Sequence, residues 1–216
     1  MKYGCVIFDL DGTLVDTLED IAVSMNHALE GRGFPSLPVE SYKKIVGWGI
    51  RRLAFNALPE QDRNEETAVM VAEEARRFYA AKPLVHSRPY PGVADLMTEL
   101  RRRKIRTAVL SNKPDPVSRL VVEGSFPRGL FDLVQGEIPG LPRKPDPSGA
   151  WEILVQLDRT PRETILVGDS EIDIETAVNT GCFPLGVSWG FRPRETLEKA
   201  GAARIIGKPE ELLELL

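Results

Sequence analysis

Two aspartates near the start of the sequence stand at a spacing that could support catalysis. Asp9 and Asp11 follow the apolar run of residues 5–8 directly, in the stretch FDLDGT. Two carboxylates this close raise each other's pKa and cost free energy unless a cation or a proton intervenes. An ordinary Asp-Gly turn is the alternative interpretation of the same residues, so the rest of the chain has to decide between the two.

Three further polar clusters occur where a predicted strand ends or a predicted helix begins. They are Ser111-Asn112-Lys113, Arg143-Lys144-Pro145, and Gly168-Asp169-Ser170 with Asp173 close behind. In open α/β sheets, ligands bind just beyond the carboxyl ends of the strands. We therefore expect these clusters to meet Asp9 and Asp11 at one edge of one sheet.

The combined set suits the transfer of a phosphoryl group, which chiefly needs positioning and charge stabilisation. Convergence of Asp9, Asp11 and Asp169 requires a hard divalent cation, and Mg²⁺ is usually held by carboxylates, waters and phosphate oxygens. Ser111 and nearby backbone N–H groups can donate to phosphate, and Lys144 supplies positive charge. One aspartate could attack phosphorus, while a second protonates the leaving oxygen and later activates water.

Short apolar, β-branched runs, separated by segments with helical spacing, must position these groups. The runs predict strands at residues 4–8, 105–110, 131–134, 164–167, 183–187 and 203–206. Helices are predicted over residues 92–103, 147–157, 172–180 and 209–216. This alternation is typical of a doubly wound α/β fold, a Rossmann-like parallel sheet with helices on both faces. Trp151, at helical spacing from Leu154, is expected in the core.

An all-helical insert interrupts the alternation after the first strand. Helices are predicted over residues 17–30, 39–46, 50–57 and 63–82, and no strand is evident among them. We therefore divide the chain into an α/β core of residues 1–16 and 84–216 and a helical cap of residues 17–83. A cap inserted directly after Asp9 and Asp11 would act as a lid over them.

The polar clusters match, in order, the four motifs of the haloacid dehalogenase superfamily, which the chain resembles over nearly its whole length. The motifs are DLDGT from Asp9, LSNKP around Ser111, RKPDP around Lys144, and GDSEID with Asp169 and Asp173. The chain is most similar to the phosphoglycolate-phosphatase-like members, which carry a helical cap after the first motif. The resemblance implies a hydrolase of a small phosphorylated metabolite, with phosphoglycolate as the leading candidate.

The resemblance also implies roles for the acidic residues. Asp9 is expected to be the nucleophile, forming an aspartyl-phosphate, and Asp11 the general acid and base. Side chains of Asp9 and Asp169 and the backbone carbonyl of Asp11 are expected to bind Mg²⁺. Asp173 is expected to support this metal site, although a carboxylate at a helix N-terminus is an alternative interpretation.

The remaining motif residues are expected to hold the phosphoryl group. The resemblance gives this role to Ser111 and Lys144, with further donors from Gly12 and Asn112. Two alternatives remain open from the sequence: Ser111 could cap a helix that begins after it, and Lys144 could lie in a solvated loop.

Substrate specificity is expected from the loop between the second and third cap helices. Gly47 and Gly49 permit unusual backbone angles and close approach to a ligand. Trp48 offers a flat face, and Arg51 or Arg52 could bind a carboxylate of the substrate bidentately. The alternative interpretation is an ordinary turn between helices.

Several other functions fit the residues less well. Dehalogenases of the superfamily usually lack the second aspartate, which is present here as Asp11. Sugar-phosphate mutases usually carry a histidine where this chain has Ile21, so a mutase is disfavoured but stays an alternative, as do phosphatases of sugar phosphates or nucleotides. A non-enzymatic phospho-acceptor module is a further alternative. No G-x-G-x-x-G follows the first strand, which argues against a dinucleotide-dependent dehydrogenase.

Composition limits the partners and the location. The chain has 216 residues, of which 42% are hydrophobic and 28% charged, and its net charge of −4 gives no basic footprint for nucleic acid or anionic membrane. No apolar run is long enough for a membrane span or signal peptide. Two cysteines in apolar surroundings fit a reducing compartment. We expect a cytoplasmic monomer or homodimer.

Overall fold

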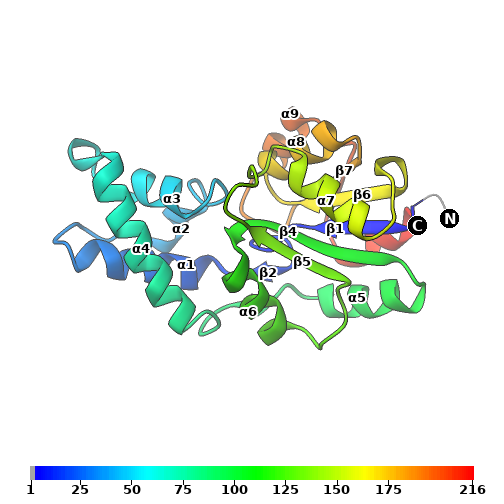
Figure 1. Ribbon diagram of the computed structural model, residues 1–216, viewed down its shortest axis with the longest axis horizontal. Helices are drawn as coiled ribbons and strands as arrows, with labels where there is room; N and C mark the ends of the chain where they lie inside the picture. Colours follow the sequence, from blue (N-terminus) through cyan, green and yellow to red (C-terminus); the bar gives the residue numbers. More distant parts are fainter. Residues whose placement is uncertain (1–2) are drawn as a thin grey trace. The chain divides into compact units, whose positions relative to one another are not determined.

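A six-stranded sheet carries the predicted site residues. The computed structural model describes residues 3–216, and its strands lie in the order β5-β4-β1-β6-β7-β8 (Figure 1). All five pairs of neighbouring strands are parallel. The strands are β1 (Cys5–Phe8), β4 (Arg106–Pro114), β5 (Leu133–Glu137), β6 (Thr164–Gly168), β7 (Phe183–Val187) and β8 (Arg204–Ile206).

Helices cover both faces of this sheet. In Figure 1, α5 (Val93–Arg102) and α6 (Asp115–Ser125) lie on one face, while α7 (Ser148–Gln156), α8 (Glu171–Thr180) and α9 (Arg194–Ala200) lie on the other. The predicted doubly wound α/β fold is therefore confirmed. The chain ends with a 3₁₀ turn, η3 (Pro209–Glu214), so the predicted helix over residues 209–216 is wrong in type. Helix α9 was not predicted, and α6 was raised only as the helix that Ser111 could cap.

The central strands are continuous apolar runs because both of their faces are covered. Every residue of β1 is buried, and Ile7 pairs with Ala108 of β4 and Leu166 of β6. Both cysteines are buried and free, as expected. Burial raises the pKa of Cys5 to about 11 and that of Cys182 to about 12.

Strand β4 runs further than the sequence predicts. It continues to Pro114, with an irregular register between Leu110 and Pro114, where Pro114 pairs with Glu137 of β5. The polar residues 111–113 thus belong to the distorted end of a strand and not to the loop after it.

The chain's contacts divide it into two units. One unit comprises the segment up to Asp16 together with Pro89–Leu216, and the other is Thr17–Arg88. The sequence analysis placed the second boundary near residue 83. Two short strands, β2 (Val15–Asp16) and β3 (Arg88–Pro89), pair where the chain passes between the units.

Residues 17–88 are mainly helical. The elements are α1 (Leu18–Glu30), α2 (Val39–Tyr42), α3 (Ile50–Ala57), η1 (Glu60–Asp62) and α4 (Glu65–Ala81). Helix α4 packs against α1 and α3, and its N-terminus is capped by the Asn64 side chain, which accepts from Thr67 N at 2.8 Å. The buried carboxylate of Asp20 on α1 accepts from Ser87 N and Oγ at 2.8 and 2.6 Å, which fixes the end of this unit to its first helix.

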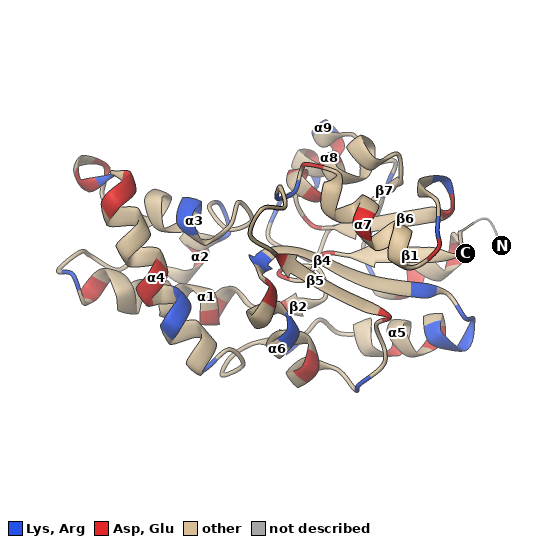
Figure 2. Ribbon diagram, viewed as in Figure 1, with Lys and Arg blue, Asp and Glu red and all other residues tan. Residues whose placement is uncertain are grey.

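Basic and acidic residues are interspersed along the helices of each unit (Figure 2). Among residues 3–216, no helix combines the length and the apolar character needed to cross a membrane.

Candidate active site

The predicted site residues from three strands and one helix meet at the carboxyl ends of the central strands. Lys144 links two of them, because its Nζ lies 2.6 Å from Asp9 Oδ1 and 2.6 Å from Asp173 Oδ1. These residues are far apart in the sequence, and all three are buried. Lys144 is therefore no solvated loop lysine.

Three acidic side chains form one cluster, and Lys144 contacts two of them. Ligand atoms of Asp9, Asp169 and Asp173 all lie within 4.8 Å of one another. The residues alone predicted the carboxylate of Asp11 in this group, whereas the resemblance gave Asp11 a metal role through its backbone carbonyl and Asp173 a supporting position. Instead the Asp11 side chain turns toward Lys113, and Asp173 completes the cluster.

Burial and mutual repulsion disfavour the ionised carboxylates. Burial raises the pKa of Asp9 well above its ordinary value, and Asp173 and Asp169 act in the same direction against Lys144. Burial, together with Asp173, raises the pKa of Asp169 to about 7. Burial lowers the pKa of Lys144, but attraction by Asp173 and Asp9 outweighs it, so the pKa is raised and the lysine stays charged.

The cluster fits a hard divalent cation. Three carboxylates and one ammonium group leave a formal excess of two negative charges in a buried space. Carboxylate oxygens are the ligands that Mg²⁺ prefers. A bound Mg²⁺ would offset the repulsion that raises the pKa of Asp9 and Asp169.

Asp169 is held by contacts that the sequence analysis did not predict. Thr13 Oγ1 donates to Asp169 Oδ1 at 3.0 Å, and the backbone N–H of Phe191 donates to Oδ2 at 2.8 Å. Gly12 and Gly190 press against the same carboxylate. A Cβ at Gly12 would lie 2.5 Å from Asp169 Oδ2, and one at Gly190 would overlap Asp169 Cβ. Gly12 also has a φ of +91°, which favours glycine.

Asp173 has a second function at the start of α8. Its Oδ2 accepts from Ser170 N at 3.1 Å and from Ser170 Oγ at 2.6 Å, in a capping box. Its Oδ1 faces Lys144. One oxygen of Asp173 therefore caps the helix and the other joins the acidic cluster, while its support of a metal site stays a prediction.

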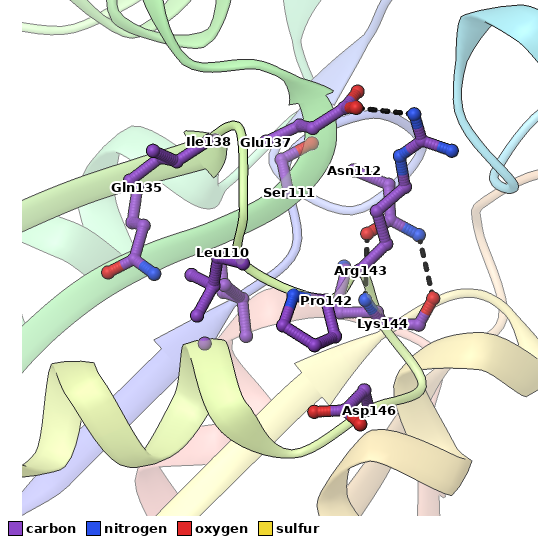
Figure 3. Close-up of a pocket in the computed structure, with 13 residues that line it drawn as sticks. Leu110, Ser111, Asn112, Gln135, Glu137, Ile138, Pro142, Arg143, Lys144 and Asp146 are labelled. Atoms are coloured by element: carbon purple, nitrogen blue, oxygen red, sulfur yellow. Dashed lines mark hydrogen bonds and ion pairs between the residues drawn. The ribbon is translucent and has the colours of Figure 1, made fainter.

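Asn112 connects the second motif to the third. Its Nδ2 donates to Lys144 O at 3.0 Å, and its Oδ1 accepts from Lys144 N at 2.9 Å (Figure 3). Both polar ends of the amide are thus engaged with the Lys144 backbone. The sequence analysis gave Asn112 a phosphate-binding role, whereas its side chain here positions Lys144.

Ser111 is buried beside Asn112, at the distorted end of β4. Its Oγ accepts from Lys113 N at 3.2 Å. Ser111, Asn112 and Lys144 also line a small pocket. Figure 3 shows an ion pair between Arg143 and Glu137 among the residues that line it.

The predicted specificity loop lies in the other unit. Gly47 and Gly49 have φ values of +118° and +84°, so both adopt the backbone region that favours glycine. Trp48 is 41% exposed, and Arg51, at the start of α3, is exposed as well. The role of these residues in specificity stays a prediction.

Comparisons with known proteins bear on this site. A family profile described as haloacid dehalogenase-like hydrolase matches residues 6–187. A phosphoglycolate phosphatase of Rhodospirillum rubrum is 34% identical over 210 residues, which cover 93% of this chain and 85% of that relative. A phosphoglycolate phosphatase of Aquifex aeolicus is 30% identical over 186 residues, covering 86% and 85%.

Solved structures agree with the sequence comparison. A protein from Lactobacillus delbrueckii subsp. bulgaricus has a TM-score of 0.93 and 34% identity, covering 100% of this chain and 98% of that one. A predicted phosphatase from Clostridium acetobutylicum has a TM-score of 0.87 and 26% identity, with the same coverage. The resemblance inferred from the four motifs is confirmed: the chain belongs to the haloacid dehalogenase-like hydrolase family.

Proposed function

We propose that this protein is a Mg²⁺-dependent phosphomonoesterase of a small phosphorylated metabolite, with phosphoglycolate as the leading substrate. The observation that carries the proposal is the buried cluster of Asp9, Asp169 and Asp173, two of which contact Lys144, at the carboxyl ends of β1 and β6. The relatives named phosphoglycolate phosphatase support the choice of substrate. The two buried, unpaired cysteines support a cytoplasmic location.

In this mechanism Asp9 is the nucleophile and Asp11 is the general acid and base. A carboxylate oxygen of Asp9 attacks phosphorus, and the bond from phosphorus to the ester oxygen breaks. Protonated Asp11 gives its proton to the departing oxygen, which leaves as an alcohol. Asp11 then takes a proton from water, whose oxygen attacks the aspartyl-phosphate, and inorganic phosphate leaves while the Asp9 carboxylate is restored.

The other residues hold the phosphoryl group in place. Lys144 and Ser111 donate to its oxygens, with Gly12 and the Asn112 backbone as further donors. Asp9 and Asp169, with the backbone carbonyl of Asp11 and support from Asp173, would hold Mg²⁺, which would supply positive charge to the phosphoryl oxygens.

A panel of phosphate esters, with release of inorganic phosphate as readout, tests the proposal. We expect turnover of phosphoglycolate that EDTA abolishes and added Mg²⁺ restores. Full activity without a divalent cation would contradict the metal-dependent mechanism. Preferred turnover of a sugar phosphate or nucleotide would identify that ester as the substrate in place of phosphoglycolate. Isomerisation without phosphate release would identify a mutase.

A further inference from the structure

Lys113 makes a close contact with Asp11 that the mechanism above leaves unexplained. Lys113 Nζ lies 2.9 Å from Asp11 Oδ1 and 2.8 Å from Oδ2, across 102 residues of sequence. The two side chains are only 8% and 13% exposed. A partly buried ion pair of this kind costs desolvation, so its contribution to stability alone is a weak explanation of its presence.

The backbone of Lys113 is held by hydrogen bonds at both its N–H and its carbonyl group. Its N–H donates to Ser111 Oγ at 3.2 Å, and its carbonyl accepts from Ser118 Oγ on α6 at 3.1 Å. Gly136 of β5 packs so closely that an added Cβ would lie 2.6 Å from Lys113 O. The lysine therefore extends from a fixed point at the distorted end of β4.

Each of the two aspartates of the first motif thus forms an ion pair with a lysine. Lys144 contacts Asp9, and Lys113 contacts Asp11. We propose that Lys113 is a positioning residue that orients the Asp11 carboxyl group toward the leaving oxygen. Both oxygens of Asp11 lie within hydrogen-bond distance of Lys113 Nζ, so the lysine fixes the direction in which the carboxyl group points. This inference rests on the proposed function.

The test uses Lys113→Met and compares two esters in kcat/KM, which reports the steps through the first P–O cleavage. An alkyl phosphate has a poor leaving group that needs a proton, while p-nitrophenyl phosphate does not. General acid catalysis contributes about 10²–10⁴-fold. We expect kcat/KM for the alkyl ester to fall by at least about tenfold more than that for the aryl ester, with Lys113→Arg retaining most of the wild-type ratio.

Two controls sharpen the result. Adding Lys113→Met to Asp11→Asn should leave the alkyl-to-aryl ratio unchanged, because the acid is already absent. Arg106→Met removes an ion pair with Asp132 near the other end of β4, with atoms 2.7 Å apart, and it should leave the ratio at the wild-type value.

Equal losses for both esters would overturn the proposal and assign the pair to structure alone. Failure of both Lys113→Met and Lys113→Gln to fold would overturn it in the same way. The proposed function fails by a different result, namely that the wild-type protein releases no phosphate from any ester with Mg²⁺ present.

Discussion

The carboxyl edge of the sheet and the loop of residues 46–52 place their polar side chains in opposite environments. At the sheet edge, the side chains of Lys144 and Asp173 are 3% and 2% exposed, and each contacts named partners. In the loop, Trp48 is 41% exposed, and the guanidinium of Arg52 lies 5.7 Å from the centre of the Phe55 ring. One region is a packed polar network, and the other presents large side chains to solvent.

This difference suggests a division of labour between the two units. Groups that react must be held within a fraction of an ångström, which requires packing and satisfied hydrogen bonds. Groups that select among substrates can sit on a more variable surface. Substitutions at the sheet edge should therefore affect all substrates, while those in the loop should discriminate among them.

The largest effect is expected from Asp9→Asn. Loss of the nucleophile should lower kcat by roughly 10³-fold or more for every ester. The fold should persist, because burial already disfavours the Asp9 charge and asparagine is nearly isosteric. Phosphate release and a thermal melt of the same sample measure both points. The exposed Asp95 of α5 provides a control, and Asp95→Asn should keep wild-type activity. Substantial turnover by Asp9→Asn would refute the assigned nucleophile.

A smaller effect, confined to the metal requirement, is expected from Gly190→Ala. The new methyl group would overlap Asp169 Cβ and Gly12 O, so Asp169 must move. Loss of such support typically costs about 10–100-fold in metal affinity, and the Mg²⁺ concentration for half-maximal activity should rise accordingly. Gly4→Ala is the control, because its nearest neighbour lies 3.8 Å away. An unchanged Mg²⁺ requirement would show that close packing around Asp169 is unimportant.

The sequence predicts the backbone of the site better than its side-chain partners. Apolar runs identify the strands because a covered parallel sheet buries both faces, and polar residues at the strand ends therefore mark the site edge. The hydrogen bond from Phe191 N to Asp169 and the contact of Lys113 with Asp11 have no such signal. They depend on the path of a loop and on the reach of a long side chain.

Periodicity also misplaces residues at the border of a buried face. Trp151 shares its helical spacing with Leu154 and was expected in the core, yet it is 48% exposed. The buried residues of α7 include Ala150, Ile153 and Leu154, so Trp151 lies just beyond the edge of that stripe. The pattern fixes the existence of a buried face but not its limits.

The amide clamp of Asn112 offers a test within the sheet edge. Asn112→Ala removes two hydrogen bonds to the Lys144 backbone, each contributing about 0.5–1.5 kcal/mol. If the clamp positions Lys144, KM and the inhibition constant for inorganic phosphate should both rise by about tenfold, equally for all esters.

Asn179 offers a matched control for this clamp, because its side chain binds the backbone of Pro145, the residue that follows Lys144. Asn179 donates a single hydrogen bond to Pro145 O at 2.8 Å from an exposed position. Asn179→Ala should leave phosphate binding close to wild type. Equal weakening in the two variants would mean that the clamp on Lys144 is not specific.

The smallest effect is expected from Arg51→Ala. This variant tests directly whether the loop of residues 46–52 selects among substrates. An exposed ion pair contributes up to about 1 kcal/mol, or about fivefold in affinity. We expect kcat/KM for phosphoglycolate, which carries a carboxylate, to fall by about that factor, while p-nitrophenyl phosphate is unaffected. Arg52→Ala is the control, because Arg52 lies against Phe55. An equal loss of kcat/KM for both esters would show that Arg51 contributes to the turnover of all substrates. No loss for either ester would show that residues at the sheet edge select the substrate.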